Sequence, residues 1–363
     1  MKLANERHLF PGGNTSKGFY SFYRYILSQD DANRIICIKG GPGTGKSSFM
    51  KKIGKHFSNL GYQIEYHHCS SDNNSLDGVV IKDLNVALLD GTSPHIVDPI
   101  NPGAVDEILN VGVALDYKFL SNNKKEIIKI NKEIGKSFKR AYRFLGAAKG
   151  VHEDWSTLNS ECINSIKIGS LIDELKNTII TSSQEGYGND RHLFSTAFTP
   201  NGIISFNSDL SSDLDNLIVL KGGPGLKKTE ILKAIGADAQ KNGYFVEYLH
   251  DPFIPERIEN IIIPELSYAI FTSNEISDIT YSKPLKTYNM IDLCYKTALT
   301  SKINEILYDK KQFIELTDKA LACIKNSKAL HDELESFYIK AMDFSIVDNF
   351  YNEVIQKIES YIV

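Results

Sequence analysis

The sequence predicts an α/β protein built as a tandem duplication, in which each copy is a parallel sheet flanked by helices and followed by a helical segment. Three observations predict it. Several short motifs occur twice in the same order, short β-branched runs alternate with amphipathic stretches, and helical periodicity fills the later part of each copy. Strands that alternate with helices favour parallel pairing through right-handed crossovers. A chain of 363 residues is long enough for two domains.

The duplication is visible when the chain is compared with itself. The matching segments are RHLF at 7–10 and 191–194, KGGPG at 39–43 and 221–225, GYQIEYHH (61–68) and GYFVEYLH (243–250), and, more weakly, KGVHEDWSTL (149–158) and KALHDELESF (328–337). The copies meet in TSSQEGYGND (181–190), whose serine, glycine and asparagine residues are typical of a linker. We therefore predict one domain at 1–183 and its duplicate at 184–363.

The elements of the first copy follow one another clearly. RIICIK (34–39) is a short β-branched run and predicts a buried strand. An amphipathic helix begins at Lys46 and stops near Gly61. YQIEYHH (62–68) predicts a second strand, and NVALLD (85–90) predicts a third, which ends in an acid.

Helical periodicity follows in both copies, from about 105 to 180 and from 285 to 363. Within the first of these ranges, residues 124–143 carry eight basic residues and two acidic ones. A solvated helix face explains such a stretch. The functional alternative is a lid that brings Arg140 or Arg143 to a transferred phosphoryl group, because that transition state needs added positive charge. A nucleic-acid contact is the third alternative.

The segment GGPGTGKS (40–47) carries the strongest chemical signal. It has the spacing G-x-x-x-x-G-K-[ST] after a predicted strand and before a predicted helix. Glycines let successive N–H groups curl around phosphate oxygens, and the N-terminus of the helix presents its positive dipole to the same anion. Lys46 is then placed to reach the β- and γ-phosphates, and the Ser47 hydroxyl to ligate Mg²⁺. The residues predicted to bind the nucleotide are Gly40, Gly41, Pro42, Gly43, Thr44, Gly45, Lys46, Ser47 and Ser48.

Two aspartates are candidates beside this loop. VALLD (86–90) places Asp90 at the end of an apolar strand, where it would hold the magnesium ion through water; the alternative is a carboxylate that caps the turn before Gly91. Asp72 follows the second strand in a polar loop, and it either orients an attacking water or substrate hydroxyl or forms a turn. The GTP-specific element N-K-x-D is missing from its usual loop, since NKKE (123–126) starts a predicted helix instead. ATP is therefore the predicted nucleotide.

The second copy departs from the first in its glycine loop. Lys227 stands where the first copy has Gly45, and Thr272 stands where it has Asp90. A side chain at the glycine position is expected to disrupt the N–H cradle, and the metal-holding acid is lost. We predict a catalytically inactive second copy that serves as a pseudo-subunit of an internal pseudo-dimer.

Two further motifs survive in both copies. Arg7 and Arg191, the first residues of RHLF, are either structural or serve the site of the other half across a pseudo-twofold interface. VHED (151–154) and LHDE (330–333) are predicted to lie on a helix surface.

The motif at 40–47, in its strand-to-helix context, identifies the first copy as a member of the P-loop NTPase superfamily. The tandem plan, with RHLF ahead of each loop and with SLDGVVI (75–81) and ALLDGTSPHIVDP (87–99) in the first copy, resembles an uncharacterised bacterial family of tandem P-loop proteins. Those proteins are labelled ATPase or nucleotide-kinase-like. The resemblance implies the fold and ATP binding in the first half.

The primary hypothesis is therefore Mg²⁺-dependent ATP hydrolysis at one site in the first half. A small-molecule or nucleotide kinase that uses the same site is one alternative, and a non-catalytic nucleotide-sensing regulatory or scaffold protein is another. A net charge of −4 gives no general attraction to nucleic acid or to anionic membranes. Five scattered cysteines without CxxC spacing, and no long apolar run, predict a cytoplasmic protein. Besides ATP, the expected partner is an unknown small molecule or protein.

Overall fold

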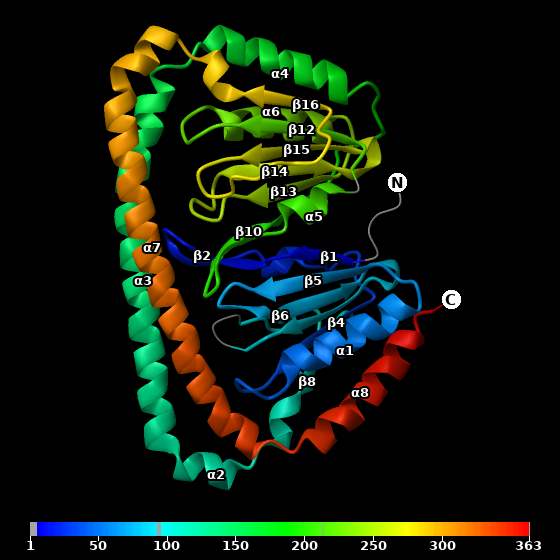
Figure 1. The fold of residues 1–363 in the computed structure, drawn as a ribbon. Helices are drawn as coiled ribbons and strands as arrows, with labels where there is room; N and C mark the ends of the chain where they lie inside the picture. Colours follow the sequence, from blue (N-terminus) through cyan, green and yellow to red (C-terminus); the bar gives the residue numbers. More distant parts are fainter. Residues whose placement is uncertain (1–5, 93–95, 213, 363) are drawn as a thin grey trace.

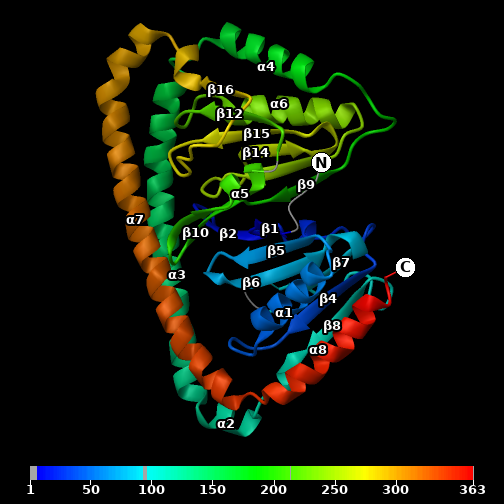
Figure 2. The same cartoon turned by 45° about the vertical axis from the view of Figure 1, so that its right-hand side comes forward.

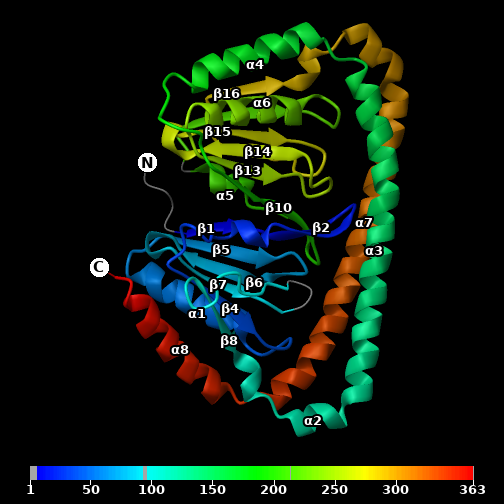
Figure 3. The ribbon, with the colours of Figure 1, turned by 180° about the vertical axis from the view of Figure 1, so that it is seen from behind.

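The structure is a computed structural model that describes residues 6–92, 96–212 and 214–362. Part of the segment ALLDGTSPHIVDP, residues 93–95, lies outside this range. The protein has two α/β lobes, one above the other, and a pair of long helices that runs along one side of both (Figure 1). The long helices are α3 (Lys124–Ser160) and α7 (Lys296–Ala341), and Figures 2 and 3 show from two other sides that they span both lobes.

The first lobe, the lower one in Figure 1, contains a six-stranded sheet in the order β1-β5-β6-β7-β4-β8. β1 is parallel to β5, and β4 is parallel to both β7 and β8, but β6 is antiparallel to both of its neighbours. The prediction of a wholly parallel sheet is therefore wrong, because the sheet is mixed. Its strands are β1 (Glu6–Leu9), β4 (Arg34–Lys39), β5 (Ile64–Cys69), β6 (Asp72–Ile81), β7 (Val86–Asp90) and β8 (Asp106–Asn110).

Short connections explain the antiparallel strand. Only Ser70 and Ser71 separate β5 from β6, and β6 returns to β7 through the 3-10 turn Lys82–Leu84 and Asn85, which is left-handed with a φ of 48°. Such tight connections reverse the chain, because a parallel crossover needs about a dozen residues or more. The predicted third strand at 85–90 is thus the second arm of a hairpin.

The second lobe repeats this plan with its sheet in the order β9-β13-β14-β15-β12-β16. The strands are β9 (Asp190–Leu193), β12 (Asn216–Lys221), β13 (Val246–His250), β14 (Ile258–Ile263), β15 (Tyr268–Ser273) and β16 (Lys286–Asn289). Two small hairpins complete the strands: β2 (Gly12–Thr15) with β3 (Gly18–Ser21), and β10 (Thr196–Thr199) with β11 (Gly202–Ser205). Because β8 and β16 occupy the start of the ranges predicted to be helical, helices begin later there than predicted.

The two sequence halves exchange helices. The remaining helices are α1 (Lys46–Asn59), α2 (Tyr117–Asn122), α4 (Ser165–Ile179), α5 (Asn207–Ser212), α6 (Lys228–Lys241) and α8 (Phe344–Glu359). α8 comes from the end of the chain, yet Val354 and Ile358 pack in the apolar core of the first lobe with α1. α4 belongs to the first sequence half, yet Leu171 and Leu175 pack in the core of the second lobe with α6. Each lobe is therefore completed by a helix from the other half.

The two lobes meet around a buried cluster of four charged residues, here called the charge quartet: Arg7, Glu65, Arg191 and Glu247. Arg7 donates to Glu65 at 2.9 Å and to Glu247 at 2.6 Å, and Arg191 donates to Glu65 at 2.6 Å and to Glu247 at 3.3 Å. Burial alone would raise the pKa of Glu65, but the charges of Arg191, Lys82 and Arg7 and a polar contact with His67 together outweigh it and hold this pKa well below its ordinary value. Of the two alternatives for RHLF, the quartet supports the structural one.

Candidate functional site

The first glycine loop, Gly40–Gly45, connects β4 to α1 in the first lobe. Gly43 and Gly45 are left-handed, with φ of 66° and 85°, a conformation that L side chains rarely adopt. The N–H groups of Gly45, Lys46 and Ser47 donate no hydrogen bond to any residue in the described part of the chain. The loop therefore presents a row of free N–H donors at the N-terminus of a helix, an arrangement that suits an anion.

Lys46 and Asp90 face each other across this loop. The Lys46 Nζ donates to the carbonyl of Gly41 at 2.7 Å and to that of Gly40 at 3.3 Å, and it lies 3.5 Å from Asp90 Oδ2. The register of the sheet causes this contact, because Asp90 ends β7 directly opposite Ile38 of β4. The two residues therefore lie together, as their positions in the sequence predicted. Asp90 Oδ1 also accepts the backbone N–H of Thr92 at 2.9 Å, as the turn-capping alternative predicted.

The hydroxyl groups of the loop have defined partners. Thr44 Oγ1 donates to the Gly41 carbonyl at 2.8 Å, and Thr92 Oγ1 donates to the Gly40 carbonyl at 2.8 Å. Ser47 Oγ accepts the backbone N–H of Leu76 at 3.0 Å, which leaves its own proton and one lone pair available. Ser48 is exposed and Pro42 is half-buried, and neither side chain forms a polar contact with a described residue.

The C-terminal end of α7 covers the first glycine loop. A Cβ at Gly41 would lie 2.6 Å from the ring of Tyr338, and a Cβ at Gly43 would lie 3.0 Å from the backbone oxygen of Glu335. These residues belong to the second sequence half, so the surroundings of the loop come from both copies. The loop motif did not predict this contact, although the weak match between 149–158 and 328–337 marks the two helical segments that cover the two loops.

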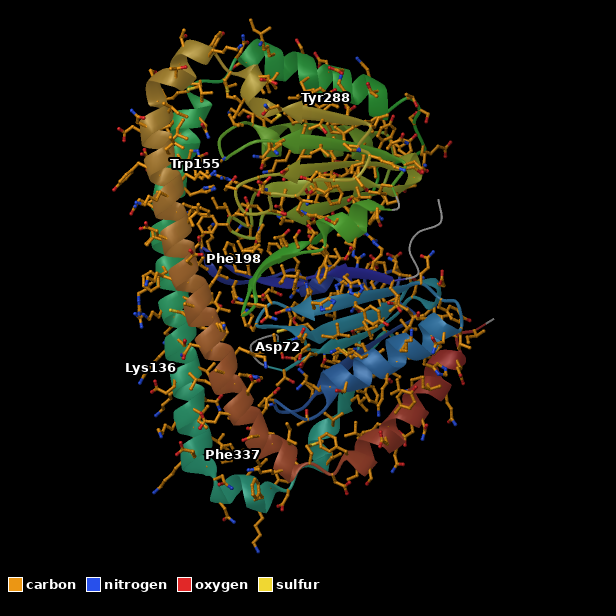
Figure 4. The ribbon with its side chains drawn as sticks, viewed as in Figure 1. Asp72, Lys136, Trp155, Phe198, Tyr288 and Phe337 are labelled. Atoms are coloured by element: carbon orange, nitrogen blue, oxygen red, sulfur yellow. The ribbon has the colours of Figure 1, made fainter. Side chains whose placement is uncertain are left out.

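Two acidic residues lie on β6, the strand whose Leu76 N–H donates to Ser47 Oγ. Asp72 is the first residue of β6 rather than part of a loop, and it lies 3.4 Å from Lys328 of α7 (Figure 4). It also accepts from Ser75 Oγ at 2.8 Å, so it stabilises a local turn as well. Asp77, which was not predicted from the sequence, lies opposite Asp90, because Gly78 of β6 pairs with Leu89 of the antiparallel strand β7. The signal that could have found it is an acid in SLDGVVI directly before an apolar run, and the structure shows this acid to be buried.

Arg140 and Arg143 are exposed on α3, and the structure does not bring them to the loop. Ser137 of α3 donates to the carbonyl of Cys323 of α7, which fixes how the two helices lie alongside each other. Arg140 then lies about 20 Å along the helix axis from the level of Glu335, at 1.5 Å per residue. Its guanidinium lies 5.8 Å from the centre of the Phe144 ring instead. This arrangement matches a solvated helix face.

The second glycine loop, Gly222–Lys227, keeps the backbone conformation of the first. Gly225 and Lys227 are left-handed, with φ of 77° and 63°, and α6 begins at Lys228 just as α1 begins at Lys46. Lys228 Nζ donates to the carbonyls of Gly222 and, at 2.6 Å, Gly223. The expectation that a lysine would disrupt this backbone is wrong, because Lys227 adopts the glycine conformation and its side chain turns outward to Glu230 at 3.0 Å.

α3 covers the second loop as α7 covers the first. A Cβ at Gly225 would lie 1.9 Å from the backbone oxygen of Ser156, and Asn159 donates to the carbonyl of Pro224 at 2.7 Å. His152, one turn earlier, is fully buried and lies 2.6 Å from Glu275. The interpretation of VHED as a helix surface is therefore wrong for His152, because α3 packs against the second lobe at this point (Trp155 in Figure 4).

Comparison of the chain with protein-family models, with curated proteins and with solved structures found no match. Among the described residues, the helices are too short or too polar to span a membrane. Function must therefore be inferred from the geometry of the two glycine loops.

Proposed function

We propose that the protein is a P-loop NTPase that binds ATP with Mg²⁺ at the first glycine loop and hydrolyses it there. One observation carries the proposal. Two left-handed glycines and a helix N-terminus direct free N–H groups at one point, with the Lys46 ammonium and the Asp90 carboxylate 3.5 Å apart beside it. This combination suits a polyphosphate that arrives with a divalent cation.

The residues present fit a magnesium ion. Mg²⁺ prefers oxygen ligands and is usually bound through one or two carboxylates together with substrate phosphates and water. Ser47 Oγ and the Asp90 carboxylate supply such oxygens next to the loop, and they would hold the ion there. The ion would neutralise charge on the transferred phosphoryl group.

The protein residues would contribute positioning and charge. Lys46 exchanges its carbonyl partners for phosphate oxygens, and the loop N–H groups hold the remaining oxygens. We assign the orientation of an attacking water to the carboxylates of β6, Asp72 and Asp77, of which Asp77 lies opposite Asp90. Because Asp72 is paired with Lys328 and Tyr338 lies over Gly41, α7 helps to exclude solvent from the loop.

The test compares Lys46→Ala with Lys55→Ala, an exposed lysine on the same helix. Lys46→Ala should abolish phosphate release and weaken ATP binding more than ADP binding, because its charge-assisted hydrogen bonds are each worth about 1.5–3 kcal/mol. Lys55→Ala should leave both unchanged. Asp90→Asn should raise the Mg²⁺ concentration needed for turnover. Equal loss of ATP and ADP affinity in Lys46→Ala would contradict the role given to Lys46.

The contact between α7 and the loop favours a second candidate, a nucleotide-dependent switch with negligible turnover. ATP that enters beside Gly41 and Gly43 must displace or reposition Tyr338 and Glu335, and α7 would transmit that movement to the second lobe. Phosphate release distinguishes the two functions. Tight ATP binding without phosphate release supports the switch, and phosphate release in the absence of any acceptor supports the ATPase.

A further inference from the structure

The second glycine loop borders a cavity of about 420 Å³, within the size range of small-molecule sites. Its walls come from the loop and the start of α6, from α3, and from the ends of β14 and β15. Among the residues that line it are Ser156, Lys228, Arg257, Glu259, Thr272 and Glu275. The cavity exists with α3 in place, although α3 packs directly on Gly225.

Two buried carboxylates in the cavity wall each have an oxygen without a partner. Glu259 is 2% exposed; its Oε1 accepts from Asn274 at 2.9 Å, and its Oε2 has no hydrogen-bond partner among the described residues. The Glu275 side chain is 7% exposed; its Oε1 lies 2.6 Å from His152, and its Oε2 likewise has no partner in that part of the chain. Buried acceptors of this kind require a donor or a cation.

The same cavity also has hydrogen-bond donors and cationic side chains. The N–H groups of Lys228 and Thr229 begin α6 and donate to no described residue, and the left-handed Lys227 keeps them in the geometry of the first loop. Lys228 Nζ donates to two loop carbonyls. Arg257 is half-buried and forms no ion pair within the described chain. These donors suit an anion, just as the carboxylates suit a cation.

The acids compensate for the residue that the second copy lost. Thr272 occupies the position of Asp90, but Glu259 stands on the neighbouring strand β14, at the position of Asp77, and Glu275 follows β15 by two residues. An oxygen ligand for a cation is therefore still present beside the second loop, supplied by different positions. Comparing Thr272 with Asp90 in the sequence does not reveal these replacement ligands.

We propose that the cavity is a second binding site, which takes a magnesium-bound polyphosphate: the loop N–H groups, Lys228 and Arg257 hold the phosphates, and Glu259 and Glu275 hold the ion. The proposal extends the function proposed for the first loop, and it concerns binding alone. Mg²⁺ bound to phosphate needs only one or two protein carboxylates, so no closed protein cage is required. The polyphosphate is either free pyrophosphate or the chain of a nucleotide.

The experiment uses the full chain and isothermal titration calorimetry with ATP, ADP or pyrophosphate, each with Mg²⁺. The wild-type chain should bind two ATP molecules, and the Lys46→Ala chain should keep one. Adding Lys228→Ala, or the pair Glu259→Gln and Glu275→Gln, to Lys46→Ala should weaken this remaining binding at least tenfold. Glu185→Gln, in the exposed linker, is the matched control and should have no effect. Omitting Mg²⁺ should weaken the remaining binding by a similar factor.

The outcomes separate the two sites. No binding to the Lys46→Ala chain, with one ATP per wild-type chain, would overturn the second site and leave the first intact. Binding to Lys46→Ala with none to Lys228→Ala would support the second site and refute the first. If ATP binding to the Lys46→Ala chain depends neither on Mg²⁺ nor on the glutamate substitutions, the proposal is also overturned. Pyrophosphate that binds as tightly as ATP identifies the polyphosphate as sufficient, and a clear preference for ATP identifies a nucleotide.

Discussion

The carboxyl group of Glu259 should control how the stability of the second lobe depends on pH. Burial, reinforced by the charge of Asp251, raises the pKa of Glu259 to about 8 from an ordinary value of 4.5. Between these two values the folded protein, in the absence of Mg²⁺ and polyphosphate, holds a proton that the unfolded chain has released. The free energy of unfolding therefore falls as pH rises through this window.

The magnitude follows from the size of the shift. Each pKa unit corresponds to about 1.36 kcal/mol, so the full shift of about 3.5 units corresponds to about 5 kcal/mol lost between about pH 4.5 and about pH 8. Glu259→Gln removes the titration while keeping an oxygen for the Asn274 hydrogen bond. The variant should match the wild type near pH 4.5 and exceed it by several kcal/mol above about pH 8.

Urea unfolding of the wild type, Glu259→Gln and the control Glu185→Gln across this range measures the effect. The control should follow the wild-type curve at every pH, because Glu185 is exposed in the linker. Parallel pH curves for the wild type and Glu259→Gln would refute the reasoning, since they would mean that water or a neighbouring group already stabilises the ionised carboxylate.

Three further predictions test the fold. Gly225→Ala should lower the free energy of unfolding by at least about 2 kcal/mol, because its Cβ would lie 1.9 Å from Ser156 O at a φ of +77°. The control Gly146→Ala, whose Cβ would meet nothing within 4 Å, should not destabilise the protein, and thermal unfolding of both variants measures the difference. Arg191→Met should destabilise by about 3–5 kcal/mol in urea unfolding, because it removes one of two buried positive charges and leaves Glu65 and Glu247 to share Arg7. A loss below about 1 kcal/mol would mean that water replaces the guanidinium. The fragment 1–183 should not fold by itself, because α8 supplies part of the core of the first lobe, but it should fold when co-expressed with 184–363. A fragment 1–183 that is monodisperse by light scattering and helical by circular dichroism would contradict the exchange of helices.

The sequence by itself determined the local elements and the duplication. RIICIK predicted a strand at 34–39, and β4 has those bounds; the helix predicted from Lys46 is α1. Both loops, and the position of Asp90 at the end of a strand, were also predicted. These features are encoded locally, through apolar periodicity, β-branched residues and glycines that permit a left-handed backbone.

Only the tertiary structure decided which segments come together. The reversal at Ser70 and Ser71 turned a predicted parallel sheet into a mixed one, and the exchange of α4 and α8 placed helices on the opposite lobe. Neither event leaves a periodic signal, because strand direction and helix docking depend on contacts between distant residues.

The candidate sites show the same division. Local sequence placed Lys46 in the first loop, but the tertiary fold brought Tyr338 and Glu335 over that loop from nearly 300 residues further along the chain. In the second loop, the sequence predicted that Lys227 would disrupt the backbone, because glycine is usually preferred at this position. In the structure Lys227 nevertheless adopts the left-handed conformation, and strand pairing places Glu259 opposite Thr272, which stands where the first copy has Asp90. Local patterns specify the backbone of a loop, whereas its surroundings depend on which distant side chains the fold packs against it.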